Sequence, residues 1–293
     1  MGKLKFTMSK TVLVTGSSGY IGKQVVRELL KQGYNVIVND LNHKNVDENA
    51  IISNENIFSG EENLFEKLGN PDVLIHLAWQ DGFIHNSDAH MLNLSKHFEF
   101  IKNMAKGGCK NIAVMGTMHE IGYWEGAINE DTPCNPLSKY GVAKNALRQS
   151  LILLSNELDF NLLWLRAYYI YGDDARASSI FAKIISAVEA GKNEFPFTSG
   201  TAKYDFISIY DLAKQIVAAS TQNEITGIIN VCSGNPVPLG TQVEQFIKDH
   251  NFNLKLKYGA FPDRPYDSPC IWGDNTKICH ILNKKNSIQN TLL

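Results

Sequence analysis

The chain has 293 residues, of which 44% are hydrophobic and 20% are charged, so it can bury a sizeable core in one large domain or two smaller ones. Its formal net charge is only −2 at pH 7. Without a strong positive field, the chain is a poor partner for nucleic acid or an anionic membrane, which leaves a small molecule as the expected ligand.

The amino-terminal stretch MGKLKFTMSK lacks the apolar segment of roughly 7 to 15 residues that a signal peptide requires. No window approaches the roughly 18 consecutive apolar residues of a membrane helix. The five cysteines form no Cys-x-x-Cys pair, which argues against a disulfide framework or a zinc site. We therefore expect a cytoplasmic protein with free thiols and no bound metal.

Short apolar runs rich in Val and Ile alternate with longer stretches of helical periodicity over the first part of the chain. This alternation is typical of βαβ units and predicts an α/β fold, a Rossmann-type doubly wound parallel sheet with helices on both faces. The predicted strands span 11–15, 35–39, 73–77, 111–116 and 161–167. In such a sheet the ligand binds at the carboxyl ends of the strands.

The first predicted strand runs into a glycine-rich turn and a helix, in VLVTGSSGYIGKQVVRELL, where Gly16, Gly19 and Gly22 are spaced three apart. Glycines at this spacing let the turn tighten and let backbone N–H groups approach a pyrophosphate, which the helix amino terminus also favours. A lone glycine triplet is weak evidence. Because the strand before and the helix after agree with it, the stretch predicts a dinucleotide-binding loop.

Asp40 closes the second predicted strand, in NVIVND. A carboxylate at this place accepts hydrogen bonds from the adenosine ribose hydroxyls and repels a 2′-phosphate. NAD(H) is therefore favoured over NADP(H). NADP(H) stays possible, because His43 and Lys44 partly offset the repulsion. The alternative is a turn aspartate that contacts no ligand.

The fourth predicted strand is followed by a polar cluster in MGTMHEIGYWEG. Thr117, His119 and Glu120 place a hydroxyl, an imidazole and a carboxylate within four residues. Because the strand ends of an open α/β sheet face the ligand, this cluster is either part of an active site or only a polar turn.

The stretch PLSKYGVAKNALRQSLILL predicts a helix that begins near Pro136 and carries Tyr140 and Lys144 four apart on one face. A Tyr-x-x-x-Lys pair is common by chance, but it is a stronger signal downstream of a dinucleotide loop. A tyrosine of ordinary pKa, roughly 10, becomes a useful proton donor and acceptor when a neighbouring ammonium stabilises its phenolate.

Beyond Gly172 the pattern is less regular. It predicts a helix over 178–190, strands over 204–209 and 228–231, and a Pro-rich carboxyl-terminal stretch. We expect a dinucleotide-binding Rossmann domain over 1–172, to which 203–232 returns, and a smaller substrate-binding lobe over 173–293.

Together these motifs resemble the extended branch of the short-chain dehydrogenase/reductase superfamily, which holds nucleotide-sugar epimerases, dehydratases and ketoreductases. The resemblance covers nearly the whole chain, through TGSSGYIG, DVLIHLAW with Asn93 in the next helix, YGVAK, LRAYYIYG, YDFISIYDLA and INVCSGNPVPL. It implies a Rossmann domain with a smaller lobe for the sugar nucleotide. It also implies a catalytic hydroxyl, tyrosine and lysine at Thr117, Tyr140 and Lys144, with the lysine holding the ribose and lowering the tyrosine pKa.

The cofactor contacts implied by the resemblance come from the glycine-rich turn, the ends of the second and third predicted strands and the Tyr–Lys pair. They are Gly16, Ser18, Gly19, Tyr20, Ile21, Gly22, Asp40, Leu77, Ala78, Tyr140 and Lys144.

The chain also departs from the family pattern. Family members usually carry a tyrosine before the glycine that ends the fourth-strand segment, whereas Ile121 precedes Gly122 here. Tyr169 stands where many epimerases carry asparagine, and Tyr204 stands where arginine is usual. Arg264, in PDRPYD, is a candidate for binding a diphosphate, with a structural surface arginine as the alternative.

Alignment on Gly122 puts Met118 and His119 where the 4,6-dehydratases hold an Asp-Glu pair. Because a methionine thioether cannot protonate a leaving hydroxyl, dehydratase activity is disfavoured. His119 is expected to hydrogen-bond the sugar, to act as a second acid or to serve as a turn histidine, and Glu120 to point away and to cap or pair locally. The expected substrate contacts are Trp79, Met118, His119, Tyr169 and Arg264.

The leading functional hypothesis is NAD(P)H-dependent reduction of a nucleotide-linked 4-keto-6-deoxyhexose of the dTDP-4-keto-6-deoxyglucose type. The alternatives are an NAD-dependent nucleotide-sugar 4-epimerase and a non-catalytic dinucleotide sensor. The joint presence of Thr117, Tyr140 and Lys144 argues against the sensor. The resemblance further implies a homodimer that pairs through the helix bearing Tyr140.

Overall fold

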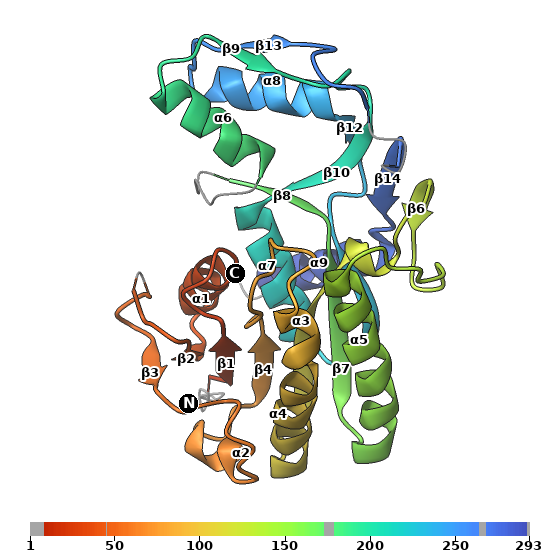
Figure 1. Cartoon of the computed structure of the whole chain (residues 1–293). Coiled ribbons are helices and arrows are strands. Elements are labelled where there is room, and N and C mark those ends of the chain that lie inside the picture. The colour runs from red at the N-terminus through yellow and green to blue at the C-terminus, as the bar shows by residue number, and fades with distance from the viewer. Residues whose placement is uncertain (1–8, 45, 173–178, 264–267, 292–293) are drawn as a thin grey trace.

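The computed structural model describes residues 9–44, 46–172, 179–263 and 268–291. Its larger part is a seven-stranded parallel sheet in the order β11-β7-β5-β4-β1-β2-β3 (Figure 1). The strands are β1 (Thr11–Thr15), β2 (Asn35–Asn39), β3 (Ile51–Ser53), β4 (Val73–His76), β5 (Asn111–Thr117), β7 (Asn161–Ala167) and β11 (Gly227–Val231). This is the Rossmann-type sheet that the sequence predicts.

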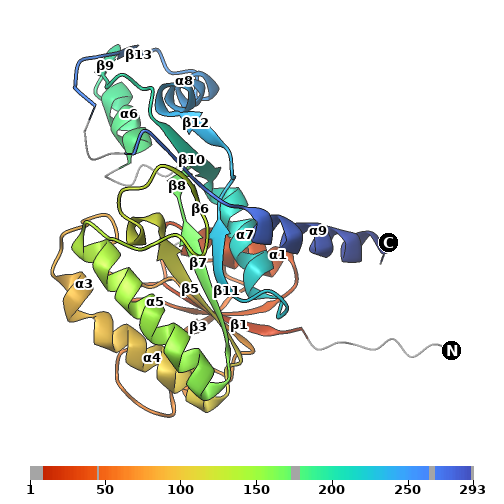
Figure 2. The same ribbon diagram turned by 90° about the vertical axis from the view of Figure 1, so that its right-hand side faces the viewer.

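Two hydrophobic cores lie on opposite faces of this sheet, because successive side chains of a strand point to opposite faces. In β1, Val12 and Val14 belong to one core and Leu13 to the other. Figure 2 shows the helices that cover each face. The first face is covered by α1 (Gly22–Lys31), α7 (Ile209–Ser220) and α9 (Thr276–Thr291), and the second by α2 (Leu64–Lys67), α4 (Leu94–Gly107) and α5 (Lys139–Leu158), with α3 (Ala89–Leu92) beside α5.

A smaller lobe lies beyond the carboxyl edge of the large sheet, at the top of Figure 1. It has its own core, to which Phe181, Phe206 and Phe246 contribute. Its elements are β6 (Gly126–Ile128), β8 (Tyr169–Tyr171), α6 (Ile180–Glu189), β9 (Glu194–Pro196), β10 (Lys203–Ser208), β12 (Pro236–Pro238), α8 (Leu239–Asp249), β13 (Lys255–Lys257) and β14 (Cys270–Gly273). The carboxyl edge of the large sheet therefore faces a second layer of structure.

The predicted elements agree with the observed ones to within a residue or two, with one larger difference. The helix expected near Pro136 begins at Lys139 instead, because the Ser138 side chain caps it by accepting a hydrogen bond from the Gly141 nitrogen. The next helix along the chain, α6, is capped in the same way by Ser179. Side-chain capping, rather than proline, sets both helix starts.

The carboxyl-terminal helix α9 packs on the large sheet and not on the smaller lobe. Its Ile278 and Ile281 are buried in the core that α7 and β11 share. The predicted lobe boundary over 173–293 does not anticipate this packing, because burial of these two isoleucines carries the helix back across the sheet. The division of the chain into two domains remains a proposal.

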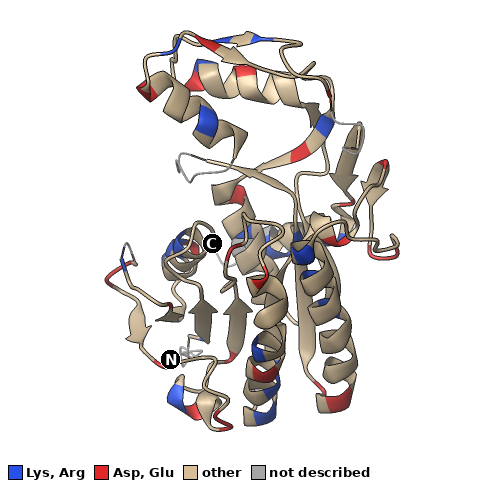
Figure 3. Ribbon diagram, viewed as in Figure 1, with Lys and Arg blue, Asp and Glu red and all other residues tan. Residues whose placement is uncertain are grey.

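Charged residues of both signs lie mainly on the helices and loops (Figure 3). Arg166 is the one Lys, Arg, Asp or Glu within the seven strands of the large sheet, and it is fully buried. A buried charge requires a partner. Among the described residues, no helix has the length and apolar character needed to traverse a bilayer.

Candidate active site

Two close backbone approaches shape the glycine-rich turn between β1 and α1. Gly16 has a φ of +69°, and a Cβ there would lie 2.6 Å from the Ala78 nitrogen. A Cβ on Gly22 would lie 2.1 Å from the Gly16 oxygen. Only glycine tolerates these contacts and this backbone angle. The turn thus forms a cradle that fits the pyrophosphate of a dinucleotide at the amino terminus of α1.

Asp40 follows β2 and holds this turn. Its Oδ2 accepts hydrogen bonds from the Ser18 nitrogen at 2.9 Å and from the Ser18 hydroxyl at 2.7 Å. Its Oδ1 accepts one from the Leu41 nitrogen at 2.7 Å. Because a carboxylate oxygen has two lone pairs, the second acceptor position of Oδ1 is compatible with a ribose hydroxyl. The sequence did not predict the bonds to Ser18, and the ribose contact remains a prediction. Tyr20 and Ile21, next in the turn, pack against the large-sheet core.

The segment after β4 runs beside the glycine-rich turn. The Leu77 nitrogen donates to the Thr15 carbonyl oxygen at 3.1 Å, and the Ala78 nitrogen donates to the Thr15 hydroxyl at 3.4 Å. These bonds tie the ends of β1 and β4 together. Ala78 therefore lies against Gly16, at the place where a cofactor contact is expected.

Trp79, the next residue, is engaged by protein groups on several sides. Its indole N–H donates to His90 Nδ1 at 3.0 Å, and its ring stacks on His97 with the ring centres 4.4 Å apart. Lys144 Nζ lies 3.7 Å from the centre of the Trp79 ring, a cation–π contact. The structure thus places Trp79 beneath the predicted catalytic lysine, and its substrate contact stays a prediction.

Thr117, Tyr140 and Lys144 come together at the carboxyl edge of the large sheet. Thr117 ends β5, Tyr140 lies in the first turn of α5, and Lys144 lies one turn further. The Thr117 side chain lies close enough to the Tyr140 phenol to lower its pKa. Lys144 Nζ donates to the Met115 carbonyl oxygen at 2.8 Å. A hydroxyl, a phenol and an ammonium therefore lie in one buried group.

Burial dominates the electrostatics of this group. It raises the pKa of Tyr140 to about 12, although the Thr117 side chain lowers it. It lowers the pKa of Lys144 to about 7, although the charge of Glu120 raises it. The net shift of the Tyr140 pKa is therefore opposite to the predicted lowering by the ammonium, because burial outweighs the other effects.

Three imidazoles lie beside Tyr140. The His90 ring centre is 5.3 Å from that of Tyr140, and this imidazole also accepts the Trp79 hydrogen bond. The His85 ring stacks on Tyr140 with the centres 5.5 Å apart, and the His85 carbonyl oxygen accepts a hydrogen bond from the Tyr140 nitrogen at 2.9 Å. The His119 ring lies 4.4 Å from that of His85 and 6.1 Å from that of Tyr140. Burial lowers the pKa of His119 to about 4 and also lowers that of His85.

The sequence pointed to His119 but missed His85. His85 belongs to the loop after β4, and no motif or spacing marks it. Its position after a strand that ends at the ligand edge was the one available signal.

The 3₁₀ turn η1 (Met118–Glu120) sends its side chains in different directions. Met118 is 7% exposed and packs in the core of the smaller lobe, so this packing does not support the predicted substrate contact. Glu120 is fully buried and accepts a hydrogen bond from the Thr117 nitrogen, as local capping requires. The polar cluster is therefore partly active-site wall and partly internal support.

The remaining candidates lie in or beside the smaller lobe. The Tyr169 ring packs 4.5 Å from that of Tyr204, and its substrate contact remains a prediction. Arg264 lies outside the described residues. Tyr123 is exposed and donates to Glu125.

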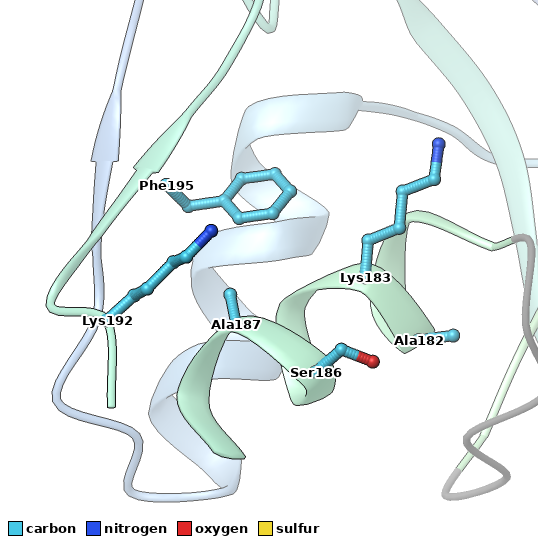
Figure 4. A pocket seen from close by; sticks show the side chains of 6 residues that line it. All are labelled: Ala182, Lys183, Ser186, Ala187, Lys192 and Phe195. Atoms are coloured by element: carbon cyan, nitrogen blue, oxygen red, sulfur yellow. The ribbon is translucent and has the colours of Figure 1, made fainter. Parts of the chain in front are cut away.

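Two hollows in the smaller lobe lie apart from Tyr140. The first encloses about 230 Å³ beside α6 and β9, and Figure 4 shows Phe195 between Lys183 and Lys192 along its wall. The second encloses about 550 Å³ and is lined by Ser199, Gly200, Thr201, Lys203, Pro238, Gly240, Thr241, Glu244 and Tyr258. Neither is lined by a predicted site residue.

A parallel sheet with a glycine-rich turn after its first strand, and a Thr–Tyr–Lys group at the same edge, defines a nicotinamide-dependent oxidoreductase. Residues 12–232 match the model of the NAD dependent epimerase/dehydratase family. The chain belongs to this family and is an NAD-dependent enzyme of the extended short-chain dehydrogenase/reductase type.

Curated relatives narrow the class to nucleotide-sugar enzymes that act at C4. The chain is 44% identical over 269 residues to the dTDP-6-deoxy-L-talose 4-dehydrogenase (NAD(+)) of Aggregatibacter actinomycetemcomitans, covering 89% of this chain and 98% of that relative. It is 25% identical over 283 residues to a putative UDP-glucose 4-epimerase of Methanocaldococcus jannaschii, covering 88% and 86%.

Solved structures share the fold. The UDP-glucose 4-epimerase of Thermotoga maritima, solved with UDP-glucose, superposes with a TM-score of 0.78 at 24% identity, covering 92% of this chain and 91% of that one. The UDP-N-acetylglucosamine 4-epimerase of Methanobrevibacter ruminantium superposes with a TM-score of 0.81 at 21% identity, covering 93% and 92%. The Rossmann-type α/β fold is thus confirmed.

Proposed function

We propose that the enzyme interconverts the C4 ketone and the C4 alcohol of a dTDP-linked 6-deoxyhexose, with reduction of the 4-keto sugar by NADH as one direction. The observation that carries the proposal is the adjacency of Thr117, Tyr140 and Lys144 in a chain 44% identical to a dTDP-6-deoxy-L-talose 4-dehydrogenase. The alcohol proposed for this chain is accordingly the 6-deoxy-L-talose form.

The site residues have distinct tasks in this reaction. When bound, NADH supplies the hydride that C4 receives. The Tyr140 hydroxyl gives its proton to the C4 oxygen, while the Thr117 hydroxyl hydrogen-bonds the same oxygen. Lys144 anchors the nicotinamide ribose. His85 and His119, as neutral imidazoles, line the side of Tyr140 and hydrogen-bond the sugar hydroxyls.

Elimination of water is not part of this proposal. A 4,6-dehydratase needs an acid and a base beside its catalytic hydroxyl. Met118 is apolar and packed away, and the carboxylate of Glu120 is engaged by the Thr117 nitrogen and by Trp164. The enzyme is therefore expected to release no 4-keto-6-deoxy product from dTDP-glucose and NAD.

A 4-epimerase is the second candidate, favoured by the curated epimerase relatives. An epimerase uses the same three groups but returns the hydride to the opposite face of the ketone. It consumes no added cofactor.

The test measures NADH absorbance with a panel of sugar nucleotides. We expect stoichiometric NADH oxidation with a dTDP-4-keto-6-deoxyhexose and NAD reduction with dTDP-6-deoxy-L-talose. Interconversion of C4 epimers without net cofactor change, on tightly retained NAD, would support the epimerase instead. No turnover of any sugar nucleotide would refute both.

We also propose a cytoplasmic homodimer. The five cysteines are free, which suits a reducing compartment. On α5, Val142 and Leu153 are 41% and 72% exposed, and Leu92 on neighbouring α3 is 73% exposed. A second copy of this face would cover these side chains.

A further inference from the structure

The buried guanidinium of Arg166 pairs with the carboxylate of Glu120. Arg166 Nη2 on β7 and Arg148 Nε on α5 each lie 3.5 Å from Glu120 Oε2. The Trp164 indole N–H donates to both oxygens of Glu120, at 2.9 and 3.0 Å. Glu120 and Arg166 have no exposed side-chain surface. Glu120 therefore joins β7 and α5 at one buried point.

The same carboxylate reaches the catalytic group from the protein side. Glu120 Oε1 accepts a hydrogen bond from the Thr117 nitrogen at 2.7 Å, while the Thr117 hydroxyl accepts one from the His119 nitrogen at 3.3 Å. The two side chains form a capping box. The Thr117 side chain in turn lies beside the Tyr140 phenol, whose pKa it lowers. Thr117 thus lies between the buried ion-pair network of Glu120 and the proposed proton donor, Tyr140.

We propose that Glu120 is a positioning residue that fixes the Thr117 hydroxyl against Tyr140 by tying the end of β5 to β7 and α5. It contacts neither substrate nor cofactor and acts through the Thr117 backbone. The inference rests on the proposed roles of Thr117 and Tyr140.

The negative charge of Glu120 has an additional effect on its neighbours. The groups that face it are Arg148, Tyr140 and Lys144 from α5, Arg166 and Trp164 from β7, and Tyr168 after β7. The charge raises the pKa of Tyr140 and the pKa of Lys144. It therefore favours the protonated phenol and the charged ammonium, against the burial that lowers the pKa of Lys144 to about 7.

Two substitutions separate the geometric effect from the charge effect. Glu120→Gln keeps the length and one acceptor but removes the charge. Glu120→Asp keeps the charge but is one methylene too short to reach the Thr117 nitrogen. Leu154→Ala is the control for stability, because Leu154 is buried at the far end of α5 and its truncation destabilises the fold without touching this network.

The readouts are kcat, KM, NADH affinity and the pH profile of 4-keto sugar reduction. We expect Glu120→Asp to lower kcat at least about tenfold through misplacement of Thr117, with NADH affinity and the basic limb of the profile unchanged. Glu120→Gln should move the basic limb to lower pH, because Tyr140 then loses its proton more readily. Leu154→Ala should lower Tm and leave kcat and the limb in place.

Equal kcat in Glu120→Asp and Leu154→Ala, at similar losses of Tm, would reduce Glu120 to a structural role and overturn the proposal. Should Glu120→Gln not fold, the Glu120→Asp comparison still decides. Failure of the proposed function has a different signature, since the unmodified enzyme would then reduce no sugar nucleotide. In that case phenolate absorbance, taken as the difference from Tyr140→Phe, reports the Tyr140 titration without substrate. An unshifted titration in Glu120→Gln would refute the charge effect.

Discussion

At the scale of single residues, Tyr140 is a protonated phenol that lies beside the Thr117 hydroxyl. Its pKa of about 12 keeps it a donor across the physiological range. We predict that Tyr140→Phe lowers turnover at least about a hundredfold, since a general acid is lost, while NADH affinity changes only a few fold. Steady-state rates and NADH titration check this. Near-normal turnover would remove Tyr140 from the mechanism.

Substitution of His119 and His85 distinguishes three roles for these imidazoles, namely sugar binding, acid catalysis and support of a turn. Because both rings lie beside Tyr140, we predict that His119→Ala and His85→Ala mainly raise KM through lost sugar hydrogen bonds. Loss of a transition-state acid would instead lower kcat, and loss of a structural turn would lower Tm alone. A kcat effect of either variant with unchanged KM would contradict the binding role.

Asp40 combines cofactor choice with support of the glycine-rich turn. We predict that the enzyme uses NADH better than NADPH and that Asp40→Ala narrows the gap, because a like-charge clash with a 2′-phosphate is removed. Ser18→Ala is the matched control, since it loses the hydroxyl bond to Asp40 but keeps the charge. Equal use of both cofactors by the unmodified enzyme would show that Asp40 does not face the ribose.

At the scale of elements, β4 and α4 meet through two buried histidines. His76 Nδ1 shares a hydrogen bond with the Thr15 hydroxyl at 2.7 Å, and His76 Nε2 shares one with His97 Nδ1 at 2.9 Å. Burial lowers the pKa of His97 to about 3 and lowers that of His76 as well. Both rings are thus neutral in the folded enzyme near pH 7.

This pair predicts an acid-sensitive contact. Below the ordinary histidine pKa of 6.5 the unfolded chain takes up protons that the folded pair does not, so stability falls as pH decreases from about 6.5 towards 3. We expect Tm to fall between about pH 7 and about pH 5, and His97→Gln to make that fall shallower. His280→Gln, on the exposed side of α9, should not. Identical slopes for all three proteins would contradict this origin.

Continuous apolar runs ending in polar residues made six of the seven strands of the large sheet predictable almost to the residue. The edge strand β3 was not predicted, because it is only three residues long and none of them is buried. The glycine-rich turn and the Tyr–Lys pair were predictable because spacing along the chain sets them. The support of the site was not, because Glu120 meets Arg166 across 46 residues of sequence and His85 reaches Tyr140 through a loop. Such contacts depend on how the helices, strands and loops pack against one another, and a local sequence pattern does not determine that packing.

At the scale of the whole molecule, the exposed apolar side chains of α3 and α5 bear on assembly. We predict that the enzyme has about twice the 32.7 kDa chain mass in light scattering and that Leu153→Lys shifts it to the monomer, because a charge would be buried at the interface. Phe261→Lys, at a residue of the smaller lobe that is 54% exposed, should leave the mass unchanged. A monomeric unmodified enzyme would refute the dimer.

The contact between Lys144 and Trp79 gives the enzyme an internal optical probe. An indole's emission responds to the electric field across its ring, and an ammonium 3.7 Å from the ring centre is a large local source of field. The pKa of that ammonium is about 7, so its charge changes near neutrality. Comparison with Trp79→Phe isolates this tryptophan from the other three. The intrinsic fluorescence of the unlabelled enzyme therefore reports the charge and the displacement of its own catalytic lysine.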